Sequence, residues 1–293
     1  MGAKGKRGFF ALWRLDLRAL LGLMLLALGA AGAITITALA AQEGVEVPVI
    51  MYHSVLKDEA QHGAYVISPA EFEKDLLWLK ENGYTTVSTG ELIAYTQGGT
   101  LPEKPVLITF DDGYYNNYLY AYAIAKQYRC RFLLSPIGRY ADSYTETGET
   151  NAYYTHATWE QLREMVDSGL VELGNHSYNL HNAKNAPGVK RKRGESDEAY
   201  RARITADLTK AQEAFQRELG EAPRVFVYPF GAMGDGVGEI VRELGFEVTF
   251  TCREKVSRIT RDKESLYGLG RYLRPSGISS GEFFKKIGLQ PLG

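Results

Sequence analysis

Two adjacent carboxylates, Asp111 and Asp112, follow the largely apolar run 106–110 and precede Gly113. Such a run predicts a buried strand, and barrel and open α/β enzymes hold their reacting groups at the carboxyl ends of strands. Neighbouring side chains on an extended segment point in opposite directions. We therefore expect one carboxylate to hold a metal ion and the other to handle a proton. A strand that ends in an ordinary Asp-Gly turn is the alternative for this stretch alone.

Two of the five histidines, His176 and His181, follow the largely apolar run 170–173. A spacing of five does not place two side chains on one face of a helix, so they can reach one ion only from a loop, which the end of a strand supplies. Two imidazoles and one carboxylate, with a position left for water, are ligands typical of a catalytic zinc or a related divalent cation. Two histidines in a surface loop are the simpler alternative.

These residues need a scaffold that brings the ends of separate strands together. Strand-like and helix-like segments alternate about seven times after residue 45, without an internal repeat or a long linker. This alternation predicts mostly parallel pairing, and hence an α/β fold, a distorted (β/α) barrel of about seven parallel strands. An open doubly wound sheet is the alternative. The strands are expected at 45–51, 84–87, 106–110, 131–135, 170–173, 225–228 and 246–252, with 269–272 as a candidate eighth.

The N-terminal part of the chain differs from the rest. Residues 1–18 carry five basic side chains, and residues 19–41 carry no charge. A basic flank before a hydrophobic helix predicts a membrane-targeting segment whose flank lies in the cytoplasm. The 23-residue span is close to the roughly 20 residues that cross a bilayer, which favours a single-pass anchor in the cell membrane with an extracellular domain. Ala-Leu-Ala at 38–40 also fits a signal-peptidase site, and cleavage near Ala40 would give a secreted protein.

Charge and cysteine content limit the partners of residues 45–293. Without the five basic residues and Asp16 of the first 41 residues, the formal net charge of −1 becomes −5, which argues against a nucleic-acid partner. Cys130 and Cys252 do not have the spacing of a metal site. They are expected to form either one disulfide, which an extracellular setting permits, or two separate buried thiols.

Two stretches together resemble a known family. Thr-Phe-Asp-Asp-Gly at 109–113 and His-Ser at 176–177, followed by His181, resemble the first two motifs of the NodB-like polysaccharide deacetylases of carbohydrate esterase family 4. The resemblance covers residues 47–293. Two departures are a wider spacing of the histidines and Val227 where the third motif begins with an arginine. Both departures resemble features of the poly-N-acetylglucosamine deacetylase branch of this family. Tyr-His-Ser at 52–54 also resembles a motif of that branch.

The resemblance implies a hydrolase that removes N-acetyl groups from N-acetylhexosamine units of a cell-envelope or extracellular polysaccharide. It implies one divalent cation, zinc first and cobalt or nickel as alternatives. Asp111 would be the general base, His53 would protonate the departing amine, and the backbone N–H of Phe230 would stabilise the oxyanion. The metal ligands would be Asp112, His176 and His181.

Other residues would position the base or contact the sugar. Because Val227 replaces the arginine that orients the catalytic aspartate, Arg271 or Arg274 is expected to take that role. The residues expected to contact the substrate are Tyr114, Tyr228 and Arg271. Two alternatives are an amidohydrolase of the same fold that acts on a small amide or imide, and a glycan-binding module without catalysis. Asp111, Asp112, His176 and His181 are all present, which argues against a module that only binds glycans.

Overall fold

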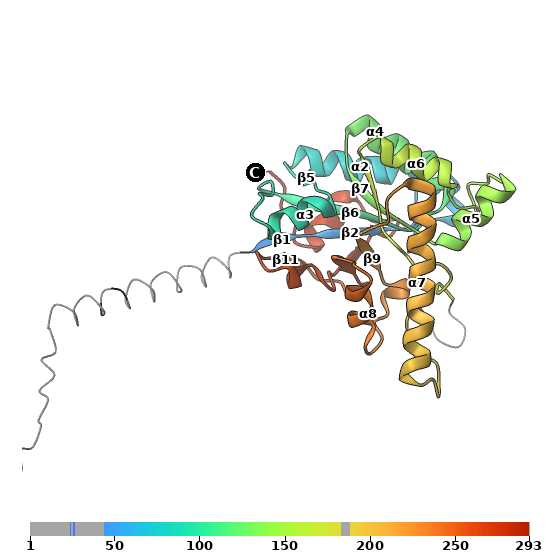
Figure 1. Ribbon diagram of the computed structural model, residues 1–293. Coiled ribbons are helices and arrows are strands. Elements are labelled where there is room, and N and C mark those ends of the chain that lie inside the picture. The colour runs from blue at the N-terminus through green and yellow to red at the C-terminus, as the bar shows by residue number, and fades with distance from the viewer. Residues whose placement is uncertain (1–23, 25, 27–43, 183–187, 293) are drawn as a thin grey trace, which may run out of the picture. The chain divides into compact units, whose positions relative to one another are not determined.

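In this computed structural model, the described residues are Met24, Leu26, 44–182 and 188–292 (Figure 1). The chain divides into two compact units, residues 1–43 and 44–293. The predicted hydrophobic helix and the cleavage site at 38–40 lie outside the described residues, apart from the helical positions Met24 and Leu26. No helix in the described part of the chain has the length and apolar character needed to cross a membrane.

Seven parallel strands form a ring in the second unit. They are β2 (Val49–Tyr52), β6 (Pro105–Asp112), β7 (Phe132–Pro136), β8 (Val171–Leu173), β9 (Val225–Val227), β10 (Val248–Phe250) and β12 (Tyr272–Leu273). Five strands pair in the order β12-β2-β6-β7-β8, and β9 pairs with β10. Single parallel bridges, Asn175 to Phe226 and Phe250 to Leu269, join this pair to the five. The parallel α/β sheet agrees with the prediction, and the ring closes through these two bridges.

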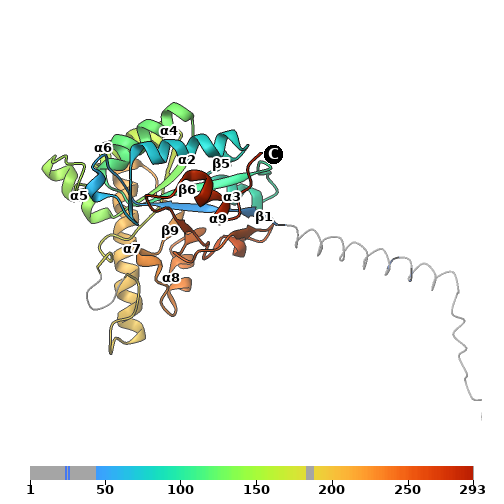
Figure 2. The ribbon, with the colours of Figure 1, turned by 180° about the vertical axis from the view of Figure 1, so that it is seen from behind.

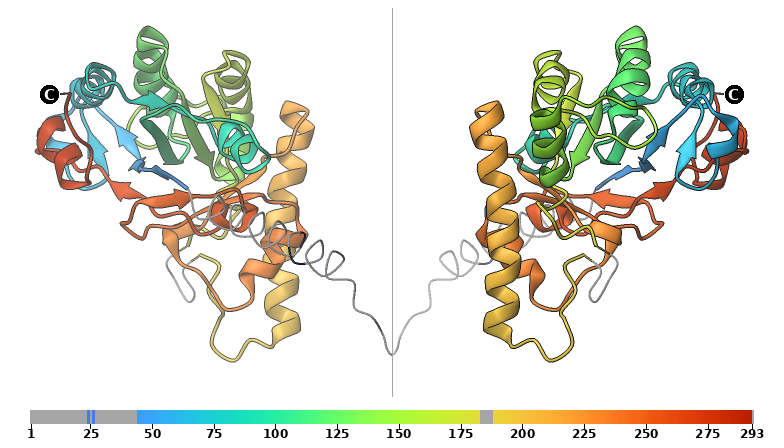
Figure 3. Two further views of the ribbon diagram at one scale, coloured as in Figure 1. Left: turned by 90° about the vertical axis from the view of Figure 1, so that its left-hand side faces the viewer. Right: turned by 90° about the vertical axis from the view of Figure 1, so that its right-hand side faces the viewer.

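Helices cover the outside of the ring in Figures 1 and 2. They are α2 (Pro69–Glu81), α4 (Ala123–Tyr128), α5 (Gly138–Thr147), α6 (Trp159–Asp167), α7 (Asp197–Leu219), α8 (Val237–Glu243) and α9 (Ser280–Lys286). The long helix α7 stands along one side of the domain (Figure 3). Helices α2, α6 and α9, and also α3 (Thr89–Thr96), begin with a capping box, which satisfies the first free N–H groups of each helix.

Alternate residues along the strands form two apolar layers, because successive side chains of a strand point to opposite faces. Inward positions form one core cluster, into which α3 packs with Leu92 and Ile93. Its other members include Val49, Leu107, Leu133, Val225, Val227, Val248 and Phe250 of the strands, and Leu269 of the segment before β12. Outward positions pack against the surrounding helices; they include Ile50, Tyr52, Ile108, Phe110, Leu134, Phe226 and Tyr228.

Several strands differ from the prediction. The segment expected as one strand at 45–51 is broken at Pro48, which has no N–H to donate to a sheet, into β1 (Val45–Val47) and β2. β1 pairs antiparallel with β11 (Ser257–Ile259), a strand that was not predicted. The strand expected at 84–87 is only β5 (Thr85–Thr86), which pairs with the start of β6. β3 (Ser54–Val55) and β4 (Val66–Ile67) form a further short pair.

Candidate active site

A cavity of about 680 Å³ opens where the strands of the ring end. It brings together side chains that the sequence places far apart. The predicted site residues among its lining are His53, Asp111, Asp112, Tyr114, His176, His181 and Phe230. Tyr228 and Arg271, which were predicted to contact substrate, do not line it.

The two adjacent carboxylates have different partners. Asp111 is buried inside the ring. Asp112 has a φ of 67°, and its carboxylate faces the two histidines. The next residue, Gly113, has a φ of 75°, and a Cβ there would lie 2.5 Å from the Cβ of Pro136. Glycine is therefore required where the chain leaves β6.

Asp112, His176 and His181 form a group with the chemistry of a metal site. One ligand atom from each lies within 4.8 Å of the others. The Nε2 atoms of His176 and His181 are 3.6 and 3.3 Å from Asp112 Oδ1. That oxygen is buried and has no hydrogen-bond partner in the described part of the chain. Because buried polar atoms are normally paired, an oxygen left facing two imidazole nitrogens fits a divalent cation.

The protonation states also suit a metal. Burial lowers the pKa of His176 to about 3 and lowers that of His181, so both imidazoles are neutral near pH 7. His176 Nδ1 lies 2.8 Å from the carbonyl oxygen of Val227. This contact places the proton on Nδ1 and leaves Nε2 free as a ligand. Burial raises the pKa of Asp112 to about 6, and a bound cation would favour its ionised form.

Helix α7 holds the loop that carries the two histidines. The carboxylate of Asp207 accepts the N–H groups of Tyr178 and Asn179 at 2.8 and 3.0 Å. The side-chain amide of Asn175 donates to Gln212 Oε1 at 3.0 Å. These contacts explain how a loop, rather than one face of a helix, brings two histidines five residues apart to the same carboxylate.

Arg271, and not Arg274, pairs with Asp111. Its Nη1 and Nη2 donate to the two carboxylate oxygens at 2.6 and 2.8 Å, and both side chains are buried. Burial alone would raise the pKa of Asp111, but the Arg271 guanidinium outweighs it and holds the pKa well below its usual range. Arg274 pairs with Asp75 of α2 instead. The expectation that Arg271 contacts substrate is corrected, because its guanidinium is occupied by Asp111.

His53 and Phe230 flank the carboxylates and the histidines. His53 Nε2 lies 3.9 Å from Asp111 Oδ2. The Phe230 ring stacks on His181 at 4.2 Å, and its backbone has a φ of 58°. Asp112, Ser177 and Phe230 are three of the four described non-glycine residues with a positive φ. Such strained backbone gathers at functional sites, where the surrounding structure holds it in place.

The predicted aromatic contacts need correction. Tyr228 is 1% exposed and packs outward against α7 and α8. It follows Val227, which points inward, and strand alternation turns the next side chain away from the cavity. Tyr114 does line the cavity, but one face of its ring is covered by His156, at 4.7 Å. The sequence prediction overlooked His156, which has no motif around it.

Further residues of the site were also missed. Tyr65, Tyr153 and Cys252 line the cavity from loops with no recognisable pattern. Two adjacent asparagines, Asn116 and Asn117, lie buried beside it; a polar pair at the start of an otherwise apolar helix was the available signal. Cys252 and Cys130 are separate free thiols, which settles the alternative between thiols and a disulfide.

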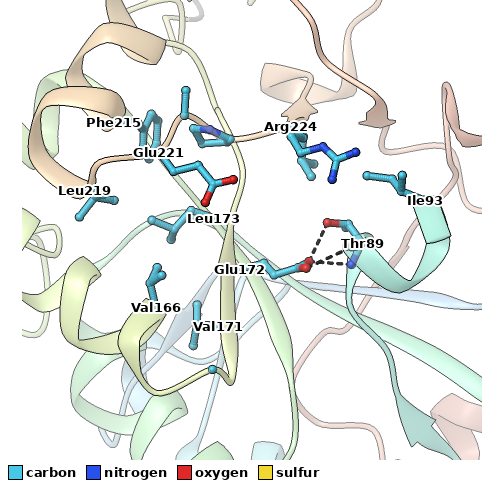
Figure 4. A pocket seen from close by; sticks show the side chains of 15 residues that line it. Thr89, Ile93, Val166, Val171, Glu172, Leu173, Phe215, Leu219, Glu221 and Arg224 are labelled. Carbon is cyan, nitrogen blue, oxygen red and sulfur yellow. Dashed lines mark hydrogen bonds between the residues drawn. The ribbon is translucent and has the colours of Figure 1, made fainter.

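A second cavity, of about 380 Å³, lies where β8 and β9 begin (Figure 4). The carboxylate of Glu172 accepts the Thr89 N–H, the Thr89 hydroxyl and the Gly90 N–H at 2.6, 2.6 and 3.1 Å. The side chain therefore caps the N-terminus of α3. Both carboxylate oxygens of Glu172 accept hydrogen bonds, whereas Asp112 Oδ1 accepts none in the described part of the chain. The candidate catalytic site is therefore the first cavity.

Comparisons with known proteins agree with this location. Residues 98–249 match the sequence model of a family described as polysaccharide deacetylase. The chain is 30% identical over 260 residues to the poly-β-1,6-N-acetyl-D-glucosamine N-deacetylase of Escherichia coli (strain K12), covering 81% of this chain and 38% of that protein. It is 27% identical over 195 residues to the protein of that name from Staphylococcus aureus (strain N315), covering 65% and 62%. The chain thus spans less than two thirds of each relative.

Solved structures show the same arrangement of the chain. A de-N-acetylase from Aggregatibacter actinomycetemcomitans superposes with a TM-score of 0.73 at 31% identity, covering 83% of this chain and all of that one. IcaB from Ammonifex degensii superposes with a TM-score of 0.64 at 29% identity, covering 80% and 94%.

Proposed function

Because this chain belongs to the polysaccharide deacetylase family, we propose that it is a metal-dependent hydrolase that removes N-acetyl groups from a polysaccharide. The proposed substrate is an extracellular or cell-envelope polymer of N-acetylhexosamine. Poly-β-1,6-N-acetylglucosamine is the first candidate. The names of the relatives from Escherichia coli and Staphylococcus aureus support this choice.

One observation carries the proposal. A carboxylate paired with a buried arginine, Asp111, lies directly beside a second carboxylate that faces two neutral imidazoles. A module that only binds glycans has no need for this asymmetry. An amide hydrolase needs both a proton acceptor and a Lewis acid at the same carbonyl.

Asp112, His176 and His181 would hold the cation. When bound, a divalent cation supplies a Lewis acid that activates water and polarises an amide carbonyl. Asp111, which Arg271 keeps ionised, accepts the proton of the attacking water. His53 donates a proton to the sugar nitrogen as the C–N bond breaks, and the N–H of Phe230 donates a hydrogen bond to the developing oxyanion.

Acetate release tests the proposal. The protein, loaded with zinc or cobalt, is incubated with β-1,6-linked N-acetylglucosamine oligomers, with chito-oligosaccharides and with a small acetamide. We expect release from the first substrate and a fall of about 100-fold or more in kcat for Asp111→Asn, since the base is lost. Tight zinc binding without release from any glycan would exclude deacetylation, and release from the small amide alone would favour the small-amide hydrolase.

We also propose that residues 19–41 tether the domain to the cell membrane with the catalytic part outside the cell. The basic flank and the uncharged span support an anchor. The mass of the cell-associated protein tests this proposal. Loss of about 40 N-terminal residues would show cleavage near Ala40 and secretion instead.

A further inference from the structure

Within the described residues, no hydrogen bond to the imidazole of His53 holds it in place. Its Nδ1 is buried without a partner in the described part of the chain. Its Nε2 is 3.9 Å from Asp111 Oδ2, which is beyond hydrogen-bonding distance. The ring makes an edge contact with Tyr65, at 4.9 Å between centroids. The position of this imidazole therefore depends on the backbone that carries it.

Two fully buried asparagines hold that backbone. Asn117 Nδ2 donates to the carbonyl oxygen of His53 at 2.7 Å. Asn116 Nδ2 donates to Ser54 Oγ at 2.7 Å, and Asn116 Oδ1 accepts the Val55 N–H at 3.0 Å. Both asparagines are 0% exposed. Three consecutive residues, beginning with His53, are thus bonded to the same asparagine pair.

The asparagine pair belongs to the segment that carries the two carboxylates. It begins four residues after Asp112, and Asn117 starts a π-helical stretch, Asn117–Tyr122. Such stretches often mark functional positions within helices. The side chains join with an Asn117 Nδ2 to Asn116 Oδ1 bond of 3.2 Å. One short segment therefore bears Asp111 and Asp112 and also fixes the strand end that bears His53.

We propose that Asn116 and Asn117 are positioning residues that set the distance between His53 and Asp111. This inference rests on the proposed function, in which His53 protonates the leaving amine. An amide side chain suits the task because it offers a donor and an acceptor at fixed geometry without adding a charge to the site. Placement errors of about 1 Å lower enzymatic rates by up to about 100-fold.

Asn117→Ala tests the inference, with Asn82→Ala as the matched control. Asn82 is also buried, and its Nδ2 likewise donates to a backbone carbonyl, that of Trp78, at 2.7 Å, but it lies at the end of α2. We expect Asn117→Ala to lower kcat for acetate release by about 10- to 100-fold, with KM and zinc affinity within about twofold. Asn82→Ala should leave kcat unchanged. If Asn117→Ala does not fold, Asn117→Ser takes its place.

A double-mutant cycle with His53→Ala separates positioning from a general structural role. If Asn117 acts through His53, its replacement should change kcat by less than about twofold once His53 is absent. An equal fall in kcat with and without His53 would overturn the inference, and so would a large loss of zinc affinity.

A crystal structure of the Asn117→Ala variant decides the same point without activity. We expect His53 to shift while Asp112, His176 and His181 keep their positions. An unmoved His53 would overturn the inference. Wild-type protein that releases no acetate would instead contradict the proposed function, and the position of His53 in the variant would still test the role of Asn117.

Discussion

At the scale of single residues, the ionisation of Asp111 depends on the guanidinium of Arg271. Both side chains are buried, and each carboxylate oxygen accepts one of its N–H groups. Breaking a buried pair leaves an uncompensated charge, which is far more destabilising than losing a surface ion pair. Without Arg271, the strongest of the interactions that lower the pKa of Asp111 is lost, while burial still raises that pKa.

Replacing Arg271 by methionine should therefore affect both stability and rate. We expect a loss of about 3–5 kcal/mol in the free energy of unfolding, measured by urea denaturation, and a fall of about 100-fold or more in kcat per folded molecule. Arg274→Met is the control, since it breaks the buried pair with Asp75 and should destabilise without lowering kcat. Equal kcat values for the two variants would contradict a special role of Arg271.

At the scale of elements, α7 keeps the two-histidine loop in place. Asp207 accepts two consecutive N–H groups of that loop, and burial raises the pKa of Asp207. Between β8 and the start of α7, the described residues 174–182 and 188–196 form no helix or strand. The affinity of the site for a metal should therefore depend on a residue that does not bind it.

Asp207→Ala should weaken zinc binding by about 10- to 100-fold, the range typical of residues that support metal ligands. Competition with a chromophoric chelator would measure this change. Glu213→Ala, an exposed position on the same helix, serves as the control and should bind zinc like the wild type. Unchanged zinc affinity in Asp207→Ala would show that the loop keeps its position without Asp207.

A residue of another element adds to the capping box at the N-terminus of α3. Glu172 of β8 accepts the N–H groups of Thr89 and Gly90 (Figure 4). Replacing it by alanine should lower the free energy of unfolding by about 1–3 kcal/mol, because these donors lose a charged partner. Thermal and urea unfolding would measure the loss. Glu221→Ala, at an exposed position of the same cavity, should change stability little, and kcat should stay the same in both.

At the scale of the whole domain, the C-terminal segment returns to α2 on the outside of the ring. Glu71 of α2 accepts the Ser276 hydroxyl and the Gly277 N–H, each at 2.9 Å. These contacts join positions about 200 residues apart in the sequence. Although partial burial alone would raise the pKa of Glu71, its hydrogen bonds lower it from 4.5 to about 2.

This shift predicts a pH-dependent contribution to stability. Because the pKa is lower in the folded state, the contribution is fully present above pH 4.5 and is lost as pH falls towards 2. The wild type should be more stable than Glu71→Gln by about 1–2 kcal/mol near pH 7, with solvent screening allowed for. Urea unfolding at several pH values should show this difference shrinking below pH 4.5. A difference that stays constant down to pH 2 would contradict the assignment.

The sequence by itself determined the features that depend on local pattern. Apolar runs marked most strands of the ring, because this signal arises within a few residues of the chain. The motifs located Asp111, Asp112, His176 and His181 at strand ends. Parallel strands then place those ends at one edge of the sheet, where the structure brings the four side chains together.

Only the tertiary structure decided which distant groups meet. Arg271 reaches Asp111 because its side chain continues the inward face that Leu269 begins, whereas Arg274 reaches Asp75 outside the ring. The alternation of side chains along a strand also turns Tyr228 away from the cavity. Pairing across about 160 residues depends on the register of strands that are not neighbours in sequence. Local spacing carries no information about that register, since it is set by the packing of the closed ring.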